Sequence, residues 1–195
     1  MKKNEPGFIL LAAGKSERFG SNKLLASVDS TQPIVLQTAM RILSASKRLL
    51  VVSNQNDTAV NTLLDNVGAS RTSTPNSSLG MAHSLSYGVQ QRAHWGGWII
   101  CLADMPAIKP STYRDIQHSL KTQQLVVPQH QGKQGNPVGF SKSFFDELLA
   151  LKGDRGAKSI LLDHLDQTHH INCVDPGIFL DADTPQDLEV LKSLE

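Results

Sequence analysis

The sequence predicts one α/β domain of three layers, in which a mainly parallel, mixed sheet is flanked by helices. Short apolar runs alternate along the chain with stretches of helical periodicity, which is typical of parallel strands joined by crossover helices. The run 98–103 is apolar throughout, as expected of a central strand covered on both faces. The chain has 195 residues, of which 39% are hydrophobic, and this suffices for a single domain with a full core.

The individual elements follow from this alternation. Apolar runs predict strands at 7–12, 48–53, 98–103, 125–128, 136–140 and 170–174, with a weaker run at 69–73. Amphipathic stretches predict helices at 33–46, 57–66, 81–93, 110–121, 143–151, 156–165 and 185–194. Thr184 is placed to cap the last helix, with Pro185 in its first turn and Asp187 completing a capping box. The glycine-rich interval 130–140 indicates a hairpin or a lid.

The composition excludes several classes of protein. A formal net charge of +1 argues against a broad nucleic-acid surface, and no apolar run reaches membrane-spanning length. The N-terminus lacks the cleavage site of a signal peptide, so we expect a cytoplasmic protein. There is no coiled-coil pattern or exposed apolar stripe, so we expect a monomer.

The cysteines and histidines do not form a metal motif. Cys101 and Cys173 lie in separate apolar runs, and we interpret them as reduced thiols. Only His164, His169 and His170 cluster, and their spacing is not that of a zinc-binding helix. We therefore interpret these three histidines as residues of a solvated strand edge.

The most informative segment is the loop after the first apolar run. Its small residues and its cations Lys15, Arg18 and Lys23 would form a concave site for an anion. Five residues separate Gly14 from Gly20, which excludes a Walker A loop, and the spacing of a dinucleotide fingerprint is also missing. The loop predicts a polyphosphate site, and the alternative is a solvated basic loop.

Two aspartates complete the expected site. If the strand order begins 3-2-1-4, with the weaker run as the third strand, Asp104 ends the strand beside the loop, where such sheets bind ligands. A carboxylate near a polyphosphate requires a cation between them, so Asp104 predicts a Mg²⁺ site. Asp183 is a second ligand, and Asp181 points the same way if that segment is extended. The alternatives are a turn at Asp104 and a helix cap at Asp183.

Six segments resemble, in order, the motifs of the nucleotidyltransferases that mature the molybdenum cofactor. The first reads Leu11-Ala12-Ala13-Gly14-x-Ser16-x-Arg18-x-Gly20-x-x-Lys23-Leu24-Leu25, and the others are 80–85, 102–106, 132–138, 153–158 and 181–185. Together they cover essentially the whole chain. Within this family the chain is most similar to the CTP-dependent cytidylyltransferases, because guanylyltransferase relatives typically carry Ala-Gly-Gly where this chain has Ala12-Ala13-Gly14. The stretch 153–157 also resembles the cytidylyl branch.

The resemblance implies a fold and a reaction. The fold is a Rossmann-like nucleotidyltransferase domain spanning 1–195, with a nucleotide-binding part at about 1–106 and an acceptor-binding part at about 107–195. The terminal phosphate of molybdopterin would attack the α-phosphorus of CTP and release pyrophosphate. A phosphate monoester has a second pKa of about 6, so this nucleophile needs no general base. Catalysis would then consist of positioning and charge neutralisation.

The resemblance also implies roles for individual residues. Asp104 and Asp183 would hold Mg²⁺, with Mn²⁺ as an alternative ion, while Lys23 and Arg18 would neutralise the triphosphate. Nucleotide contacts are implied for Leu11, Ala12, Ala13, Gly14, Lys15, Ser16, Gly80 and Ser84. Acceptor contacts are implied for Asn136, Pro137, Asp154, Arg155 and Lys158.

Three departures from the family pattern concern recognition. Family members commonly have Ser where this chain has Ala82 or His83, His where it has Asn136, and Arg where it has Lys158. A lysine does not reproduce a bidentate arginine clamp. The expected partners are CTP, the molybdenum cofactor, and a molybdoenzyme or its chaperone. The alternatives are GTP as donor, another phosphorylated acceptor, or a cofactor-binding chaperone without enzymatic activity.

Overall fold

The computed structural model describes residues 4–14, 19, 22–28, 32–74, 79–153 and 156–193. The strands are β1 Gly7–Ala12, β2 Leu49–Asn54, β3 Ser70–Thr74, β4 Gly97–Leu102, β5 Leu125–His130, β6 Lys133–Gln134, β7 Val138–Ser141 and β8 Thr168–Asn172. The α-helices are α1 Ile34–Ala45, α2 Thr58–Asp65, α3 Met81–Gln91, α4 Pro110–Ser119, α5 Phe145–Ala150, α6 Lys158–Asp163 and α7 Pro185–Lys192. Short 3₁₀ segments are η1 Lys23–Leu25, η3 Lys142–Phe144, η4 Leu165–Gln167 and η5 Pro176–Phe179.

Within the described residues, the strands form one eight-stranded sheet with the order β3-β2-β1-β4-β7-β5-β6, and β8 pairs with β5. The pairs β1–β2, β1–β4, β2–β3 and β5–β8 are parallel, and β4–β7, β5–β6 and β5–β7 are antiparallel. The expected mixed sheet and the 3-2-1-4 order are therefore confirmed. The chain order reverses between β1 and β4, which is where a doubly wound sheet binds ligands outside the carboxyl ends of its strands.

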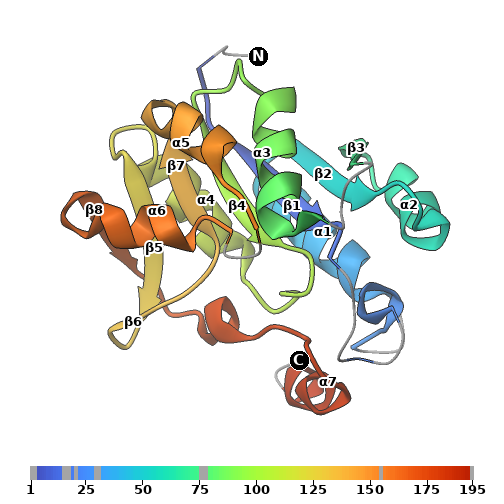
Figure 1. Cartoon of the computed structure of the whole chain (residues 1–195). Helices are drawn as coiled ribbons and strands as arrows, with labels where there is room; N and C mark the ends of the chain where they lie inside the picture. Colours follow the sequence, from blue (N-terminus) through green and yellow to red (C-terminus); the bar gives the residue numbers. More distant parts are fainter. Residues whose placement is uncertain are drawn as a thin grey trace.

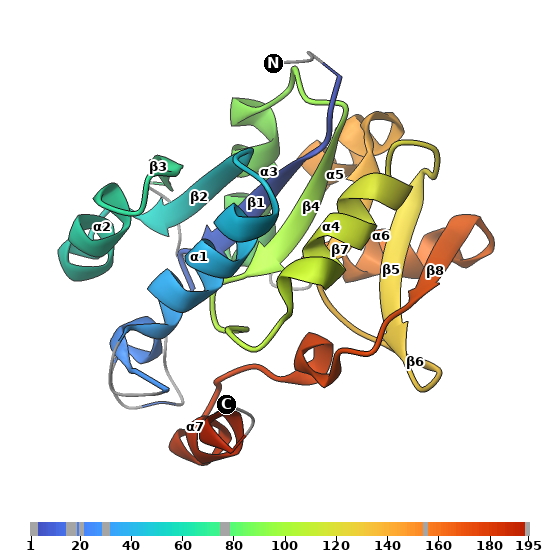
Figure 2. The same ribbon diagram turned by 180° about the vertical axis from the view of Figure 1, so that it is seen from behind.

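Helices cover both faces of the sheet (Figures 1 and 2). All six residues of β1 are buried, and their alternation divides them between two cores. Phe8 and Leu10 pack with side chains of α1, α2 and α4. Ile9 and Leu11 pack with side chains of α3, α5 and α6 on the opposite face. This arrangement fixes β1 at the centre of three layers, so the loop that leaves it starts from rigid backbone.

The glycine-rich interval 130–140 contains a hairpin, one of the two expected alternatives. Strands β5 and β6 pair through His130 and Lys133, so only two residues form the turn. Gln131 has a φ of 51° and Gly132 a φ of 77°. Positive φ at both central residues matches the two-residue turns whose twist suits a hairpin.

The structure corrects some of the expected boundaries. The last strand is β8 at 168–172 rather than 170–174, because its pairing with β5 begins at Thr168. The expected helix at 143–151 is divided into η3 and α5. The strand-edge interpretation is right for His169 and His170 but wrong for His164, which ends α6 and contacts Glu147 Oε2 through Nε2 at 2.9 Å.

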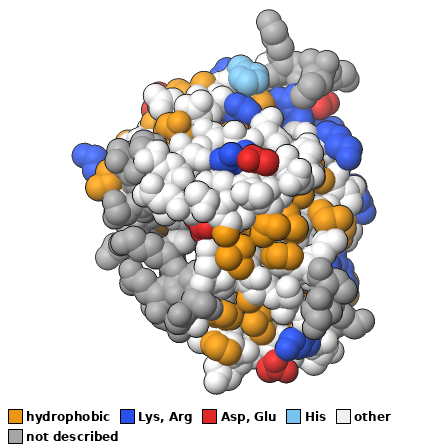
Figure 3. All heavy atoms as spheres, turned by 90° about the vertical axis from the view of Figure 1, so that its right-hand side faces the viewer, with side chains coloured by type: hydrophobic (Ala, Val, Ile, Leu, Met, Phe, Trp, Pro, Cys, Tyr) orange, Lys and Arg blue, Asp and Glu red, His pale blue; other side chains and the backbone are white. Residues whose placement is uncertain are grey.

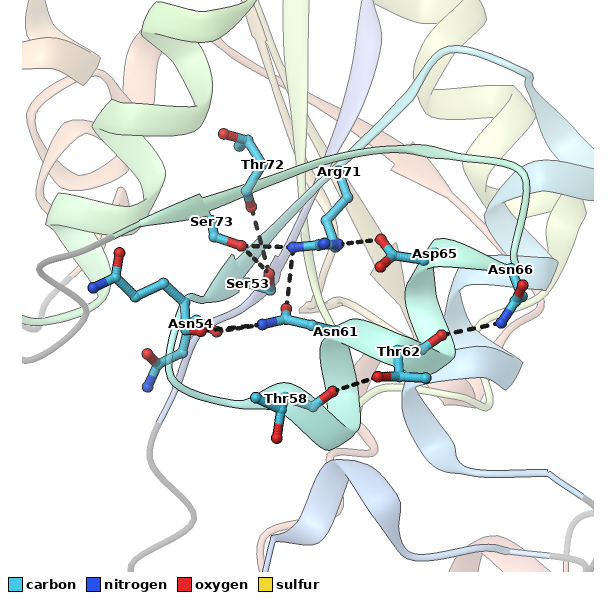
Figure 4. Close-up of polar contacts among 11 residues, drawn as sticks. Ser53, Asn54, Thr58, Asn61, Thr62, Asp65, Asn66, Arg71, Thr72 and Ser73 are labelled. Carbon is cyan, nitrogen blue, oxygen red and sulfur yellow. Dashed lines mark hydrogen bonds and ion pairs between the residues drawn. The ribbon is translucent and has the colours of Figure 1, made fainter.

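A polar network fastens α2 to the outer strands of the parallel half of the sheet (Figure 4). Arg71 of β3 donates to Asp65 Oδ1 at 2.7 Å, to Ser73 Oγ at 2.6 Å and to Asn61 Oδ1 at 3.3 Å. The Asn61 amide in turn donates to the backbone oxygen of Asn54 at the end of β2, at 2.9 Å. The network thereby fixes α2 to the carboxyl end of β2, which pairs with the end of β1 at Ser53 and Ala12.

Helix α7 is joined to the body by a small core of its own. Ala182 and Leu191 pack against Val28 and Ile34, the first residue of α1. The helix lies at the edge of the molecule in Figure 1. Figure 3 shows the face that is on the right in Figure 1, and hydrophobic side chains are exposed in the lower half of this face. Among the described helices, none is long and apolar enough to cross a membrane.

The capping box at the start of α7 gives a prediction about stability. Thr184 accepts from the Asp187 backbone N–H at 3.3 Å, and Asp187 Oδ2 accepts from the Thr184 N–H at 2.7 Å and hydroxyl at 2.8 Å. The hydrogen bond from the Thr184 side chain is the main cause of the lowered pKa of Asp187. We expect Thr184→Ala to lower the free energy of unfolding by about 1 kcal/mol in urea titrations at about pH 7.

The pH dependence of that loss has a defined sign. Because the pKa of Asp187 is lowered in the folded state, its contribution is present above the ordinary value of 3.8 and disappears as the pH falls through the lowered value. The matched control is Thr62→Ala, since the Thr62 hydroxyl bonds only within α2 to the Thr58 carbonyl at 2.8 Å. An equal loss in both variants, or a loss at Thr184 that does not become smaller at low pH, contradicts the role of the box. The loss should not vanish there, because the bond from the Asp187 N–H to the Thr184 side chain does not depend on the charge of the carboxylate.

Candidate active site

Three charged side chains from distant parts of the sequence meet beyond the carboxyl ends of β1 and β4. Lys23 Nζ donates to Asp104 Oδ2 at 2.6 Å and to Asp183 Oδ1 at 2.5 Å. Lys23 is separated from these aspartates by 81 and 160 positions in the chain. The site therefore joins the loop after β1, the loop after β4 and the segment before α7. We call Lys23, Asp104 and Asp183 the charged triad.

The backbone around Asp104 is held from three sides. The Ala103 N–H donates to the Leu11 carbonyl of β1 at 3.2 Å, and the Ala182 N–H donates to the Asp104 carbonyl at 2.9 Å. The buried hydroxyl of Thr38 in α1 donates to the Ala103 carbonyl at 3.0 Å. These bonds fix the turn that presents the Asp104 carboxylate. The sequence did not identify Thr38, because its partner lies 65 positions away.

Lys23 is positioned by the residue that precedes it. Asn22 caps η1 by accepting from the Leu24 N–H at 3.2 Å, and its amide donates to Asp57 Oδ2 at 2.6 Å. Asp57 is itself the N-cap of α2, where it accepts from the Val60 N–H at 3.1 Å. Asp57 before a helical pattern is a recognisable cap signal, but its pairing with Asn22 is not readable from the sequence.

Asp183 lies directly before α7, as expected, in a segment without regular secondary structure. The expectation that Asp181 points the same way as Asp183 if this segment is extended stays a prediction, because the lack of a regular strand does not decide it. The Asp183 N–H donates to Asp187 Oδ2 at 3.1 Å, so the capping box of α7 also fixes the backbone of this aspartate. Helix capping and display of the Asp183 carboxylate thus use the same short segment.

The electrostatics of the charged triad are those of a cation between two carboxylates. The side chains of Lys23, Asp104 and Asp183 are 15%, 18% and 39% exposed. Burial lowers the pKa of Lys23, but the charges and hydrogen bonds of Asp104 and Asp183 outweigh it and raise that pKa above its ordinary value. Burial also raises the pKa of the neighbouring Asp181 carboxyl, with the charges of Asp183 and Asp104 adding to this effect. Negative charge is therefore in excess around Lys23.

The donor set of the charged triad fits a divalent cation. Asp104 Oδ1 is buried and accepts no hydrogen bond within the part of the chain that is described. Hard cations such as Mg²⁺ take carboxylate oxygens, and one or two carboxylates suffice when phosphate and water supply the rest. No group of three or more His, Cys, Asp or Glu side chains suited to a metal occurs among the described residues. Asp104 and Asp183 are the residues that would hold the ion.

Several of the expected nucleotide contacts lie at the end of β1 and at the start of α3. Leu11 and Ala12 are the last residues of β1. The next residue, Ala13, is buried, and Gly14 is exposed at the start of the loop. Gly80 begins α3 with a φ of 99°, a value that glycine adopts without strain, and Ser84 is buried one turn later. The expected residues Lys15, Ser16 and Arg18 lie outside the described residues.

The expected acceptor segments lie on neighbouring parts of the fold. The Asn136 N–H donates to the Ile178 carbonyl of η5 at 3.0 Å, and the following peptide to the buried Pro137 is cis. The Ala82 N–H at the start of α3 donates to the Gly153 carbonyl at 3.0 Å, which joins the expected nucleotide and acceptor segments. Lys158 begins α6 and is exposed. Asp154 and Arg155 lie outside the described residues.

Comparison with known proteins agrees with this geometry. The model of the family described as "MobA-like NTP transferase domain" matches residues 8–169. The chain is 28% identical over 200 residues to the purine catabolism protein PucB of Bacillus subtilis (strain 168), with 94% of each chain covered.

Solved structures share the whole fold. Rv0371c from Mycobacterium tuberculosis H37Rv superposes with a TM-score of 0.85 and 25% identity, covering 99% of this chain and 100% of that one. A structure of Rv0371c in complex with manganese gives a TM-score of 0.81 with 22% identity, covering 97% and 99%. In each comparison, this chain and the Rv0371c chain are therefore matched essentially from end to end.

The ion pairs of Lys23 give a second prediction. In a double-mutant cycle with Lys23→Met and Asp104→Asn, we expect a coupling of about 1–3 kcal/mol in the free energy of unfolding without divalent cations. The reason is that Lys23→Met leaves two carboxylates without their cation, and Asp104→Asn leaves Lys23 with only one of its two carboxylate partners. Urea titration of the four proteins measures the coupling, and additive effects contradict it.

The pH dependence of this coupling follows from the raised pKa of Lys23. The contribution is complete below the ordinary value of 10.5 and is lost as the pH rises through the raised value of the folded protein. The free energy of unfolding of the wild type should therefore fall more steeply than that of Lys23→Met as the pH rises above 10.5. Parallel curves in this range contradict the assigned interaction.

Proposed function

The chain belongs to the MobA-like NTP transferase family, and from this membership we propose that it transfers CMP from CTP to the terminal phosphate of molybdopterin. The membership itself makes the chain a nucleotidyltransferase. The donor nucleotide, the acceptor and the metal ion are the parts that we propose.

The observation that carries the proposal is the charged triad. Lys23 follows the loop that leaves β1, and Asp104 and Asp183 provide carboxylates at the same place. A nucleotidyl transfer requires positive charge for a triphosphate and carboxylates for the ion that accompanies it. The triad supplies both in one site, at the edge of the sheet where a nucleotide is expected.

Mg²⁺ is the proposed ion, and Asp104 and Asp183 would hold it. When bound, such an ion neutralises charge on the phosphates of the nucleotide. The buried, unbonded Oδ1 of Asp104 supports this assignment. The manganese complex of Rv0371c supports a divalent cation for a protein of this fold.

The remaining chemistry is positioning. An oxygen of the pterin phosphate forms a bond to the α-phosphorus of CTP, the bond from that phosphorus to the bridging oxygen breaks, and pyrophosphate leaves with the bonding electrons. The nucleophile is already ionised at neutral pH, since its second pKa is about 6. Lys23 would neutralise the triphosphate near the reacting centre, and Arg18 and the N–H groups of residues 13–15 would hold the leaving phosphates.

The choice of CTP rests on the end of β1. Ala13 follows β1, is only 2% exposed and carries a methyl group that a glycine would lack. In the proposed pocket this methyl group would reduce the space for the base. Less space favours the smaller pyrimidine over a purine. The Ala12-Ala13-Gly14 sequence, which resembles the cytidylyl branch, supports the same choice.

The choice of acceptor rests on the segments beyond the nucleotide. Gly153 accepts a hydrogen bond from the Ala82 N–H at the start of α3, so the residue that opens the expected acceptor segment contacts the proposed nucleotide segment. Arg155 and Lys158 would supply positive charge for the pterin phosphate. Asn136 and Pro137 would contribute from the loop that is fastened to η5.

Removal of one carboxylate tests the metal assignment. We expect Asp104→Asn to lower kcat/KM for Mg²⁺-dependent pyrophosphate release by about 10²- to 10³-fold, because a preorganised charge in the site is lost. The fold should persist, as judged by circular dichroism and the unfolding midpoint. Asp166→Asn is the control, because this aspartate is exposed in η4 away from the triad. Unchanged turnover in Asp104→Asn refutes the residue as a metal ligand.

The donor is tested by pyrophosphate release with CTP and GTP in separate reactions containing the same molybdopterin acceptor. We expect a preference for CTP, and we expect Ala13→Gly to reduce it by about tenfold, since one methyl group in a pocket is worth about 1–3 kcal/mol. A preference for GTP in the wild type overturns the CTP assignment. Tight binding without pyrophosphate release from either nucleotide favours the cofactor-binding chaperone instead.

A further inference from the structure

Asp175 is a buried carboxylate that the proposed reaction does not use. Its residue is only 1% exposed, and its two oxygens accept three hydrogen bonds. Oδ2 accepts from the Thr112 hydroxyl at 2.5 Å and from the Lys109 N–H at 2.8 Å. Oδ1 accepts from the Gly177 N–H at 3.0 Å. A buried charge with this many donors is fully engaged, so it serves to join the segments that supply them.

The joined segments are those that carry the two aspartates of the charged triad. Lys109 and Thr112 lie at the start of α4, a few residues after Asp104. Gly177 belongs to η5, which leads directly to Asp183. We call the bonds from Asp175 to Lys109, Thr112 and Gly177 the Asp175 clamp.

The two segments are in direct contact along their length. At one end the Ala182 N–H donates to the Asp104 carbonyl at 2.9 Å. At the other end Gly177 approaches so closely that a Cβ atom there would lie 2.4 Å from the Ala107 carbonyl oxygen. The Asp175 clamp adds hydrogen bonds between the two segments at this second end. Contacts at both ends together fix the position of one segment relative to the other.

Side-chain packing gives these segments little support on one side. A cavity of about 210 Å³ lies against them, and its lining includes Pro106, Ala107, Pro176 and Gly177 from the two segments. Residues of α1 and Leu191 of α7 also line the cavity. On this side, the hydrogen bonds of the Asp175 clamp connect the two segments, together with the bond from Lys109 Nζ to the Val174 carbonyl at 2.9 Å.

We propose that Asp175 is a positioning residue that sets the separation of the Asp104 and Asp183 carboxylates and thereby their affinity for the divalent cation. This rests on the metal site of the proposed function. The two carboxylates accept from the same ammonium group and carry like charges, so they repel each other when Lys23 turns to a triphosphate. The clamp resists that repulsion from the far end of both segments.

The sharpest test changes the clamp without removing the buried charge. Thr112→Val deletes the hydroxyl that donates to Asp175 and keeps the shape of the side chain, whereas Thr112→Ser retains the donor. Gly177→Ala disturbs the same contact by steric means, through the Ala107 carbonyl. Val89→Ala is the control for general destabilisation, because this buried residue near the end of α3 lies in the core of the opposite face of the sheet.

Two measurements distinguish positioning from a merely structural role. The first is Mn²⁺ binding to the protein saturated with CTP in the absence of acceptor, followed by the electron paramagnetic resonance of free Mn²⁺, with CTP alone as the blank. The second is the Mg²⁺ concentration that half-saturates pyrophosphate release, compared with kcat at saturating Mg²⁺. We expect Thr112→Val and Gly177→Ala to raise both midpoints by about 10- to 100-fold, with Thr112→Ser and Val89→Ala close to wild type. We expect kcat at saturating Mg²⁺ to change much less than the midpoints.

The outcomes separate this inference from the proposed function. Wild-type protein that neither binds Mn²⁺ nor depends on Mg²⁺ overturns the metal site and the positioning role with it. Wild type that binds Mn²⁺, with Thr112→Val unchanged, overturns the positioning role and leaves the metal site in place. Equal weakening in Thr112→Val and Val89→Ala also overturns it, because general destabilisation then accounts for the effect.

Discussion

One ammonium group shared by two carboxylates connects the parts of this protein that matter for its chemistry. Lys23 bonds to Asp104 and Asp183, which lie 81 and 160 positions further along the chain. Each of these charges would destabilise the folded protein without the others, because two neighbouring carboxylates repel each other and a half-buried ammonium group loses hydration. The three side chains together neutralise most of that cost. The start, the middle and the end of the sequence are therefore constrained to meet at the edge of the sheet between β1 and β4.

The same interaction explains how the site can alternate between two roles. An ammonium that bonds to carboxylates can transfer its bonds to phosphate oxygens, because both are anionic acceptors. The carboxylates would then be available to a divalent cation, for which the buried Oδ1 of Asp104 is suited. Hydrogen bonds hold the backbone at each of the three residues: Asn22 caps η1, the Ala103 and Ala182 bonds hold the Asp104 turn, and Asp187 Oδ2 accepts from the Asp183 N–H. Preorganisation of this kind is the main source of catalysis when the nucleophile needs no base.

Local patterns in the sequence were sufficient to predict most of the fold. The alternation of apolar and amphipathic segments predicted the mixed, mainly parallel sheet, and the strand order 3-2-1-4 that was assumed in placing Asp104 is the one observed. The Thr184–Asp187 box was predicted from a four-residue signal. Contacts between residues that are distant in the sequence could not be predicted from it. Thr38, the Asn22–Asp57 pair and the Asp175 clamp act through partners far along the chain, and their sequence neighbours give no indication of those partners. The misplaced start of β8 has a similar cause, since pairing with β5 rather than apolar content decides where that strand begins.

The central claim is that Lys23 and a divalent cation share the two carboxylates according to whether a nucleotide is bound. A crystal structure of the protein with CTP and Mn²⁺, with the ion located by its anomalous scattering, tests this most directly. The account predicts one anomalous peak coordinated by Asp104 and Asp183, with Lys23 Nζ moved from the carboxylates to the triphosphate. A nucleotide-bound structure in which Lys23 keeps both carboxylates, with the ion elsewhere, would contradict it.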